Sequence, residues 1–365
     1  MTKIIPIADI RRITPAPLPR VDYTPGRPVV DAFGRALRDL RISITDRCNF
    51  RCSYCMPRDQ FGSDHAFLPH DQILSFEEIT RLARLFAQLG VNKLRITGGE
   101  PLLRKEMTRL IGMLAQIRDL DDKPLDIALT TNGTLLQRMA GPLRDAGLQR
   151  ITVSLDALDP QLFASMSDSK VHVDQVLAGI EAARSAGIEP VKVNMVVKRG
   201  VNEHQILPMA DYFRHSGHIL RFIEFMDVGA TNHWDMTDVV SGREILEILQ
   251  SKFELEPVHA NYPGEVARRW RYKDRAGEVG LITSVTHAFC GDCTRLRLSP
   301  EGKLFTCLFA ETGSDLRQML RSSASDHEIA SVLAGIWNVR NDRYSEQRDQ
   351  LHDRREKIEM SYIGG

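Results

Sequence analysis

The six cysteines of this 365-residue chain fall into two groups of three. Cys48, Cys52 and Cys55 are separated by three and two residues, whereas Cys290 and Cys293 are separated by two, with Cys307 after 13 more. A disulfide framework usually spreads an even number of cysteines over a short secreted chain, which this is not. Closely spaced thiolates suit metal binding. The spacing therefore predicts two three-thiolate metal sites, with no cysteine left over.

Two kinds of metal centre fit three thiolates. A four-iron cluster with three protein ligands leaves one iron open, and that iron can bind a further molecule. Alternatively, a fourth protein ligand closes a tetrahedral zinc site. His287 lies three positions before Cys290 and is a candidate for that ligand. Spacing alone leaves both possibilities open.

The elements that must position these triads are short strands that alternate with amphipathic helical segments. Repeated alternation of this kind predicts parallel strands joined by right-handed crossovers. The first triad directly follows the first strand, at the end of a barrel where enzymes place their chemistry. The expected strands are Arg41–Thr45, Lys93–Thr97, Asp126–Thr130, Ile151–Leu155, Val191–Val196 and Leu220–Phe225.

Side chains alternate along these strands between an apolar face and a polar face. A closed eight-stranded barrel fills its interior with branched apolar side chains. Here the predicted inner face is polar, so six strands should form an open barrel around a large polar ligand. The polar positions are Arg41, Ser43, Thr45, Arg95, Thr97, Thr130, Asn132, Thr152, Ser154, Asp156, Lys192 and Asn194.

We therefore expect an α/β fold: an open partial (β/α)6 TIM-type barrel with a C-terminal extension that carries the second triad. The predicted divisions are a flexible, proline-containing tail (1–28), the barrel (29–250) and a cluster-binding region that ends in Gly-Gly (251–365). Within the last region we expect strands at Trp270–Lys273, Val279–Thr283 and Arg295–Leu298, and polar helices over 315–350.

The charge balance excludes some partners. Forty-eight basic and 48 acidic residues cancel, so no overall field attracts nucleic acid or a membrane. No apolar run approaches the roughly 20 residues that span a bilayer. The N-terminus lacks the pattern of a secretory signal. We expect a cytoplasmic protein with neither nucleic acid nor membrane as partner.

Two motifs together resemble the signature of the radical S-adenosylmethionine superfamily: the first triad, with Tyr54 before its last cysteine, and the segment Thr97-Gly98-Gly99-Glu100-Pro101. In that superfamily the open iron chelates the amino and carboxylate groups of S-adenosylmethionine. One electron from the cluster then releases the 5′-deoxyadenosyl radical. A double glycine allows close backbone approach, and the carboxylate of Glu100 could receive the ammonium group.

From about Val30 to Gly365 the chain resembles one family, the GTP 3′,8-cyclases of molybdenum cofactor biosynthesis. The segments LRITGGEPLLR, LTTNGTLL, GLITSVTHAFCGDCTRLRLS and the terminal SYIGG carry this resemblance. It implies a lyase that converts GTP to (8S)-3′,8-cyclo-7,8-dihydroguanosine 5′-triphosphate, and a second 4Fe–4S cluster whose open iron binds the purine. Thr294 departs from the family, which more often has Asn there.

The resemblance also implies roles for particular residues. Arg41, Arg95 and Lys192 form the cationic surface that a triphosphate needs in a chain without a G-x-x-x-x-G-K-[ST] loop. Arg295 and Arg297 are the implied catalytic residues. The implied S-adenosylmethionine contacts are Tyr54, Gly99, Glu100, Ser154 and Met226; the implied GTP contacts are Arg41, Arg95, Thr130, Lys192, Arg295, Leu296 and Arg297.

Partners follow from the family alone: GTP as substrate, an electron donor such as flavodoxin or ferredoxin, and handover of product to cyclic pyranopterin monophosphate synthase. Both a monomer and a homodimer fit. One alternative is another radical enzyme with an auxiliary cluster, such as a peptide maturase, although those commonly carry more C-terminal cysteines. The other is a zinc-stabilised nucleic-acid-binding protein, which the absence of a basic stripe disfavours.

Overall fold

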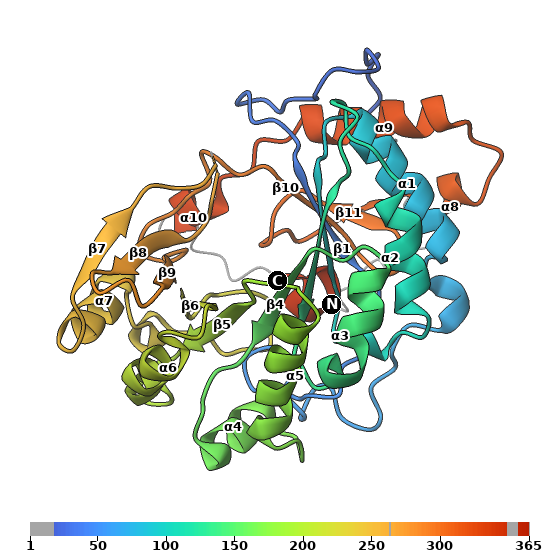
Figure 1. Cartoon of the computed structure of the whole chain (residues 1–365). Coiled ribbons are helices and arrows are strands. Elements are labelled where there is room, and N and C mark those ends of the chain that lie inside the picture. The colour runs from blue at the N-terminus through green and yellow to red at the C-terminus, as the bar shows by residue number, and fades with distance from the viewer. Residues whose placement is uncertain (1–17, 263, 349–356, 365) are drawn as a thin grey trace, which may run out of the picture.

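The computed structural model describes residues 18–262, 264–348 and 357–364. Its centre is one curved sheet with helices along the outside (Figure 1). All six predicted strands are present and lie parallel in chain order: β1 (Asp39–Ser43), β2 (Lys93–Thr97), β3 (Asp126–Thr131), β4 (Arg150–Ser154), β5 (Lys192–Val197) and β6 (Ile219–Glu224).

Two later strands extend the parallel run at its two ends. Strand β9 (Glu278–Ile282) pairs with β6, and β10 (Arg295–Leu298) pairs with β1, both in parallel. The described strands end at β12 on one side and β7 on the other, and these two do not pair, so the barrel is open as predicted. The antiparallel outer strands are β7 (Leu255–Val258), β8 (Arg268–Tyr272), β11 (Lys303–Phe305) and β12 (Ser314–Asp315).

The helices cover the apolar face of the sheet. Helix α1 (Phe76–Gln88) begins at a capping box in which Ser75 and Glu78 bond each other's backbone N–H, and its apolar stripe is buried. Ile42, Ile96 and Ile127 of the sheet are fully buried beneath the helices. The other barrel helices are α2 (Met107–Ala115), α3 (Leu136–Asp145), α4 (Pro160–Ser167), α5 (Val173–Ser185), α6 (Ile206–Phe213) and α7 (Gly242–Gln250).

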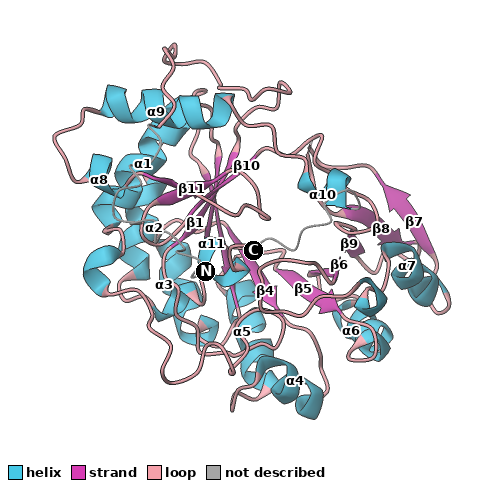
Figure 2. Ribbon diagram, turned by 180° about the vertical axis from the view of Figure 1, so that it is seen from behind, coloured by secondary structure: helices cyan, strands magenta, loops and turns pink. Residues whose placement is uncertain are grey.

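The C-terminal region adds α8 (Arg317–Leu320), α9 (Asp326–Asn338), α10 (Tyr344–Gln347) and α11 (Met360–Ile363). The prediction that 315–350 is polar is wrong for α9, because its apolar residues Ile329 to Trp337 pack against α1 and are buried. Figure 2 shows α11 on the inner side of the sheet, and α11 contacts β1.

Residues 18–23, which we expected to belong to a loose tail, are packed along α9, whereas residues 24–28 are exposed. The backbone of Val21 exchanges hydrogen bonds with Ser331 (3.3 and 2.8 Å), and Tyr23 stacks on His327. Apolar side chains in this segment anchor it to the core. The remainder of the predicted tail, 1–17, lies outside the described residues.

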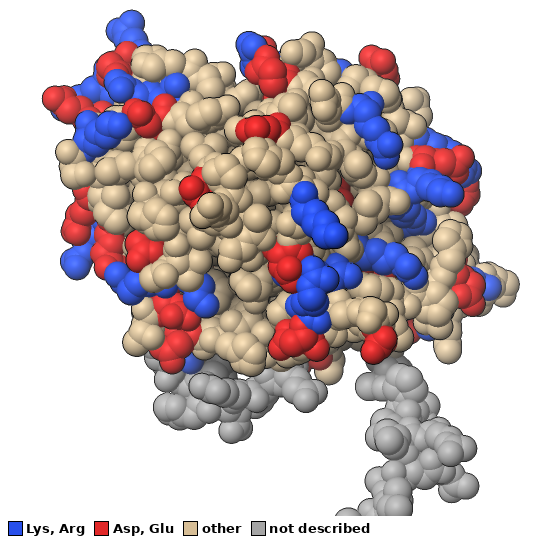
Figure 3. All heavy atoms as spheres, turned by 90° about the horizontal axis from the view of Figure 1, so that it is seen from below, with Lys and Arg blue, Asp and Glu red and all other residues tan. Residues whose placement is uncertain are grey.

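The exterior bears both signs of charge. Figure 3 shows a face on which Lys and Arg are interspersed with Asp and Glu, as the balanced composition leads one to expect. Of the helices that the structure describes, none combines the length and apolar character needed to cross a bilayer.

Candidate active site

Three arginines lie in register across neighbouring strands and face the inside of the barrel. Arg297 of β10 is paired with Arg41 of β1, and Arg41 with Arg95 of β2. All three line a cavity of about 760 Å³, a volume typical of small-molecule sites. The predicted residues Thr130, Lys192 and Asn194 also line it, which confirms the polar inner face.

The charges that line this cavity favour the binding of an anion. The pKa of Arg41 is well below its usual range because of burial and because Arg297 and Arg95 lie beside it. Burial and the nearby Arg221 likewise lower the pKa of Lys192 to about 7. Arginine remains protonated in proteins, so these shifts report unneutralised positive charge. The Nε atoms of Arg41, Arg95 and Arg221 are buried and have no hydrogen-bond partner among the residues that the structure describes.

Sequence reasoning missed several further cations that line the cavity, among them Lys93, Arg150 and Arg221. Arg221 donates to Thr152 Oγ1 (3.3 Å), to which Arg95 also points (3.5 Å). The signal for Arg221 was present, because it alternates with the buried Leu220 and Phe222 on β6. Burial lowers the pKa of Lys93 to about 7, although the nearby carboxylate of Asp39 acts to raise it.

The second cysteine triad opens onto the same cavity. Cys290, Cys293 and Cys307 all line it, and Arg295 donates to Cys293 Sγ at 3.3 Å. Burial alone would raise the pKa of Cys293, but Arg295 and Arg340 lower it to about 6 and so favour the thiolate. The structure thus joins the predicted substrate cations to the second triad.

The side chain of Leu296 is fully buried in the hydrophobic core and does not line the cavity. Alternation along β10 explains this, because Arg295 and Arg297 point inward and the residue between them points outward. The predicted contact of Leu296 with GTP therefore stays a prediction that falls to its main chain.

The first triad lies in the loop after β1, and the double glycine supports that loop directly. A Cβ on Gly99 would lie 2.3 Å from the carbonyl oxygen of Arg47, and one on Gly98 would lie 2.6 Å from that of Thr45. The N–H of Gly99 donates to Thr45 O (2.8 Å) and that of Glu100 to Arg47 O (2.8 Å). The glycines are needed where the two loops touch.

Buried carboxylates surround the first triad. Tyr54 donates to Asp156 Oδ2 at 2.6 Å, and burial raises the pKa of Asp156 to about 6. Glu100 is 1% exposed and accepts hydrogen bonds from Leu102 N, Thr131 Oγ1 and Asn132 N (2.7–2.9 Å). A carboxylate offers about four acceptor sites, so these three bonds do not exclude the predicted contact of Glu100 with an ammonium group, which stays a prediction.

The remaining predicted cofactor residues lie at the same end of the barrel. Ser154 is the last residue of β4, and Met226 follows β6 and lines the cavity. The tail also enters this region: the carbonyl of Gly364 accepts from Arg297 Nε (3.2 Å), and a Cβ on Gly364 would lie 2.2 Å from Thr97 Cγ2. Gly365 lies outside the described residues.

Each triad offers three free thiols. Three thiolates match the ligand set of a 4Fe–4S cluster with one open iron, whereas a tetrahedral zinc site needs a fourth ligand. Within the described ranges, no three Cys, His, Asp or Glu side chains converge enough to hold a single ion. His287, the candidate zinc ligand, contacts Arg268 Nη2 at 2.8 Å.

Comparison with known proteins agrees with this geometry. Residues 42–213 match the model of the radical SAM superfamily, and residues 218–346 match Molybdenum Cofactor Synthesis C. The fold resembles that of Streptococcus suis SuiB bound to S-adenosylmethionine, with a TM-score of 0.59 and 14% identity over 85% of this chain and 70% of that one.

Curated relatives are much closer in sequence. The GTP 3′,8-cyclase of Acidothermus cellulolyticus is 50% identical, over 93% of this chain and 99% of its own length. Those of Staphylococcus haemolyticus (49%; 92% and 99%) and Xanthomonas campestris pv. campestris (51%; 93% and 98%) are similar. The chain therefore belongs to the GTP 3′,8-cyclase family, whose members are radical S-adenosylmethionine enzymes.

Proposed function

We propose that this protein is a GTP 3′,8-cyclase that forms (8S)-3′,8-cyclo-7,8-dihydroguanosine 5′-triphosphate in the first step of molybdenum cofactor biosynthesis. The observation that carries the proposal is the in-register row of Arg297, Arg41 and Arg95, which ends beside the second triad. A triphosphate supplies the negative charge that this row lacks, and a polar ring can then reach the triad.

The cations of the cavity hold the nucleotide. Arg41, Arg95 and Lys192 bind phosphate oxygens, and Thr130 orients the guanidinium of Arg95 through its hydroxyl (3.3 Å). Lys93 and Arg221, which the sequence did not indicate, add donors on the same surface. Fixing the nucleotide at several points holds the ribose and the base close enough to each other for ring closure.

Cys48, Cys52 and Cys55 hold one 4Fe–4S cluster, and Cys290, Cys293 and Cys307 hold a second. When bound, the first cluster and S-adenosylmethionine supply a 5′-deoxyadenosyl radical for hydrogen abstraction from the ribose. Tyr54, Gly99, Ser154 and Met226 contact this cofactor, and the buried charge of Asp156 favours its cationic groups.

Arg295 and Arg297 are the proposed catalytic residues. Arg295 touches Cys293 Sγ and lies over the ring of Phe289, so it can position the base at the second cluster. Arg297 is 3% exposed and holds the tail through Gly364. The tail thereby lies against a cation that lines the cavity, and we expect it to limit the access of water to the reacting ribose.

The partners and the setting form part of the proposal. GTP is the substrate, a flavodoxin or ferredoxin supplies electrons, and the product passes to cyclic pyranopterin monophosphate synthase. The protein works in the cytoplasm, as a monomer or a homodimer, without nucleic acid or membrane. We retain the barrel at 29–250 and the cluster-binding region at 251–365; the two matched families instead meet between 213 and 218.

The test replaces Cys290 and Cys293 together with alanine. The variant should cleave S-adenosylmethionine slowly, because the first triad is intact, and should not convert GTP. Full GTP turnover by this variant would remove the second triad from the mechanism. Stimulation of cofactor cleavage by a peptide, but not by GTP, would instead favour a peptide-modifying enzyme.

A further inference from the structure

A buried carboxylate outside the cavity connects to all three positions of the second triad. Asp31 lies in the loop that the bridge between Val30 and Ala36 closes, and it is 4% exposed. Its Oδ1 accepts from the backbone N–H of Phe33 (3.0 Å) and of Arg35 (2.9 Å). Its Oδ2 accepts from Arg35 Nε (2.6 Å) and Arg340 Nη1 (3.0 Å). One carboxylate therefore pairs with two buried guanidinium groups.

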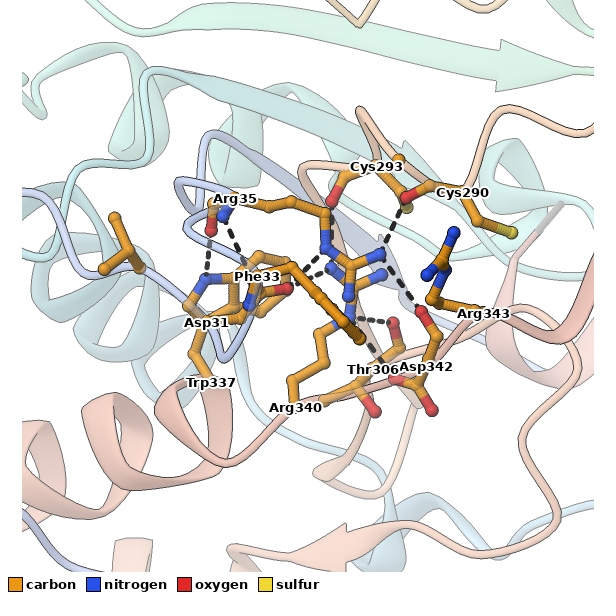
Figure 4. A network of polar contacts seen from close by, with 12 residues as sticks. Asp31, Phe33, Arg35, Cys290, Cys293, Thr306, Trp337, Arg340, Asp342 and Arg343 are labelled. Carbon is orange, nitrogen blue, oxygen red and sulfur yellow. Dashed lines mark hydrogen bonds and ion pairs between the residues drawn. The ribbon is translucent and has the colours of Figure 1, made fainter. Parts of the chain in front are cut away.

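Arg35 and Arg340 also donate to the main chain at and beside the triad, and both contact Asp342, through its carbonyl (Arg35 Nη1, 3.0 Å) and its Oδ2 (Arg340 Nε, 3.3 Å). Arg35 Nη1 donates to the carbonyl of Cys290 at 2.7 Å, and Arg340 Nη1 donates to that of Cys293 at 2.9 Å. Arg340 Nε donates to the carbonyl of Thr306, the residue before Cys307, at 3.0 Å. Figure 4 shows the two arginines between Asp31 and these carbonyls.

The triad needs such support because no regular element fixes its spacing. Cys290 and Cys293 lie in the irregular segment between β9 and β10, and Cys307 follows β11. The planar guanidinium group holds several acceptors in a fixed geometry. Two such cations side by side in the interior would repel one another, and a shared carboxylate removes that penalty.

We propose that Asp31 is a positioning residue for the second cluster: it holds Arg35 and Arg340 so that they fix the cysteine main chains at the spacing the cluster requires. The inference rests on the proposed function, since it needs a cluster at this triad. Segment 30–36 thereby determines how firmly the cluster is held and how its open iron meets GTP. Trp337 secures the same segment by donating to Arg35 O at 3.0 Å.

The experiment isolates the second cluster in the full chain. A parent with Cys48, Cys52 and Cys55 replaced by alanine is reconstituted with iron and sulfide. Asp31→Asn is added to it, which keeps an acceptor for the loop but removes the charge. Iron per chain, the rate of iron loss to a ferrous chelator, and the electron paramagnetic resonance spectrum with and without GTP are measured.

Asp31→Asn should lose iron about tenfold faster than the parent, and its spectrum should broaden and respond less to GTP. Arg340→Lys provides a second variant if Asp31→Asn folds poorly, because a single ammonium cannot reach Asp31, Cys293 O and Thr306 O together. Arg81→Gln is the matched control: Arg81 also pairs with an aspartate, Asp326, and bonds a carbonyl, Ala324 O, but contacts no cysteine segment.

Three outcomes would overturn the inference. A parent that holds no iron removes the second cluster, and with it both the proposed function and this role. A loaded parent whose spectrum, GTP response and iron-loss rate are unchanged by Asp31→Asn and by Arg340→Lys refutes the positioning role alone. Equal acceleration of iron loss by Arg81→Gln would show a general loss of stability, with no specific support of the triad.

Discussion

The two cysteine triads differ in the charges beside one buried cysteine of each. In the first, burial raises the pKa of Cys52, and its neighbours Cys55 and Asp156 raise it further. In the second, Arg295 and Arg340 outweigh burial and lower the pKa of Cys293, whereas burial raises the pKa of Cys307 to about 11. A negative environment suits a cofactor with sulfonium and ammonium groups, whereas a positive one suits an anionic nucleotide. The proposed function thus assigns the two ligands to sites that differ in charge.

The triads also differ in how the chain supports them. At the first, Arg51 alone donates to the carbonyls of Cys48, Phe50 and Phe61 at 2.7–2.8 Å, all within one loop. At the second, Asp31, Arg35 and Arg340 come from segments about 300 residues apart, a separation of 309 between the first and the last. Other strands and loops also support the first triad, as the bond from Tyr54 to Asp156 shows, but the second draws on segments much further apart in the sequence.

The largest effect is expected in the cationic cavity beside the second triad. Arg41→Gln removes the central cation of the row, and losing one charge-assisted contact costs about 1.5–3 kcal/mol, or roughly 10- to 100-fold in kcat/KM for GTP. Because repulsion from Arg297 and Arg95 is relieved, the Tm of the nucleotide-free protein should rise. Steady-state kinetics and thermal unfolding check both; a lower Tm with unchanged GTP kinetics would contradict the anion-site assignment.

A smaller effect is expected at the buried carboxylate beside the first triad. Tyr54→Phe removes the hydroxyl that bonds Asp156 and so raises the pKa of that carboxyl above about 6. Near pH 7 a larger fraction of Asp156 then loses its charge, so the Kd for S-adenosylmethionine should increase about tenfold, and further as the pH falls.

Equilibrium binding at pH 6.5 and 8 measures the effect of Tyr54→Phe, with Tyr344→Phe as the matched control because Tyr344 also bonds an aspartate, Asp227 (2.7 Å). The affinity for GTP should stay unchanged in both variants. A loss of GTP affinity in Tyr54→Phe would show that the proposed sites for S-adenosylmethionine and GTP do not act independently.

The C-terminal tail contacts both Arg297 and Thr97, and a substitution in it should change kcat several-fold. Gly364→Ala places a Cβ against Thr97 Cγ2 and also strains a backbone at φ 75°, so kcat should fall while KM for GTP changes little. Adding Thr97→Ser removes the clashing methyl group and should restore part of kcat. If the double variant is no faster than Gly364→Ala, the contact between Gly364 and Thr97 does not matter.

The smallest effect is a pH dependence of GTP binding. In the free protein the pKa of Lys192 is about 7 because of burial and Arg221, and a bound triphosphate favours the protonated amine and raises it. Affinity is therefore greatest below pH 7 and weakens as the pH rises above it. Calorimetry from pH 6 to 9 should show a few-fold loss that is reduced in Lys192→Arg; identical profiles would argue against Lys192 as a phosphate ligand.

The features that could be predicted from the sequence are those that depend on a local pattern of residues. Alternation along the strands placed Arg41, Arg95 and Lys192 inside the barrel. Cysteine spacing indicated the first triad, and the strand pattern placed it after β1. The same alternation would have placed Arg221 inside and Leu296 outside, had it been applied to β6 and β10.

Other features depend on contacts distant in the sequence. Glu100 is satisfied by Thr131 and Asn132 at the end of β3, so its burial was not visible from its own motif. The shared carboxylate of Asp31 required the fold to bring Arg340 beside it. Helix α9 was expected to be polar, but only its first turn is charged, and the fold buries its apolar remainder against α1.

The central claim is that both triads hold clusters and that GTP controls the chemistry between them. The most direct measurement is the iron and sulfide content of protein purified without oxygen, followed by incubation with reductant and S-adenosylmethionine, with and without GTP. We predict about eight irons per chain and 5′-deoxyadenosine formed chiefly when GTP is present. One or two zinc ions, no sulfide and no cofactor cleavage after reconstitution would contradict the account.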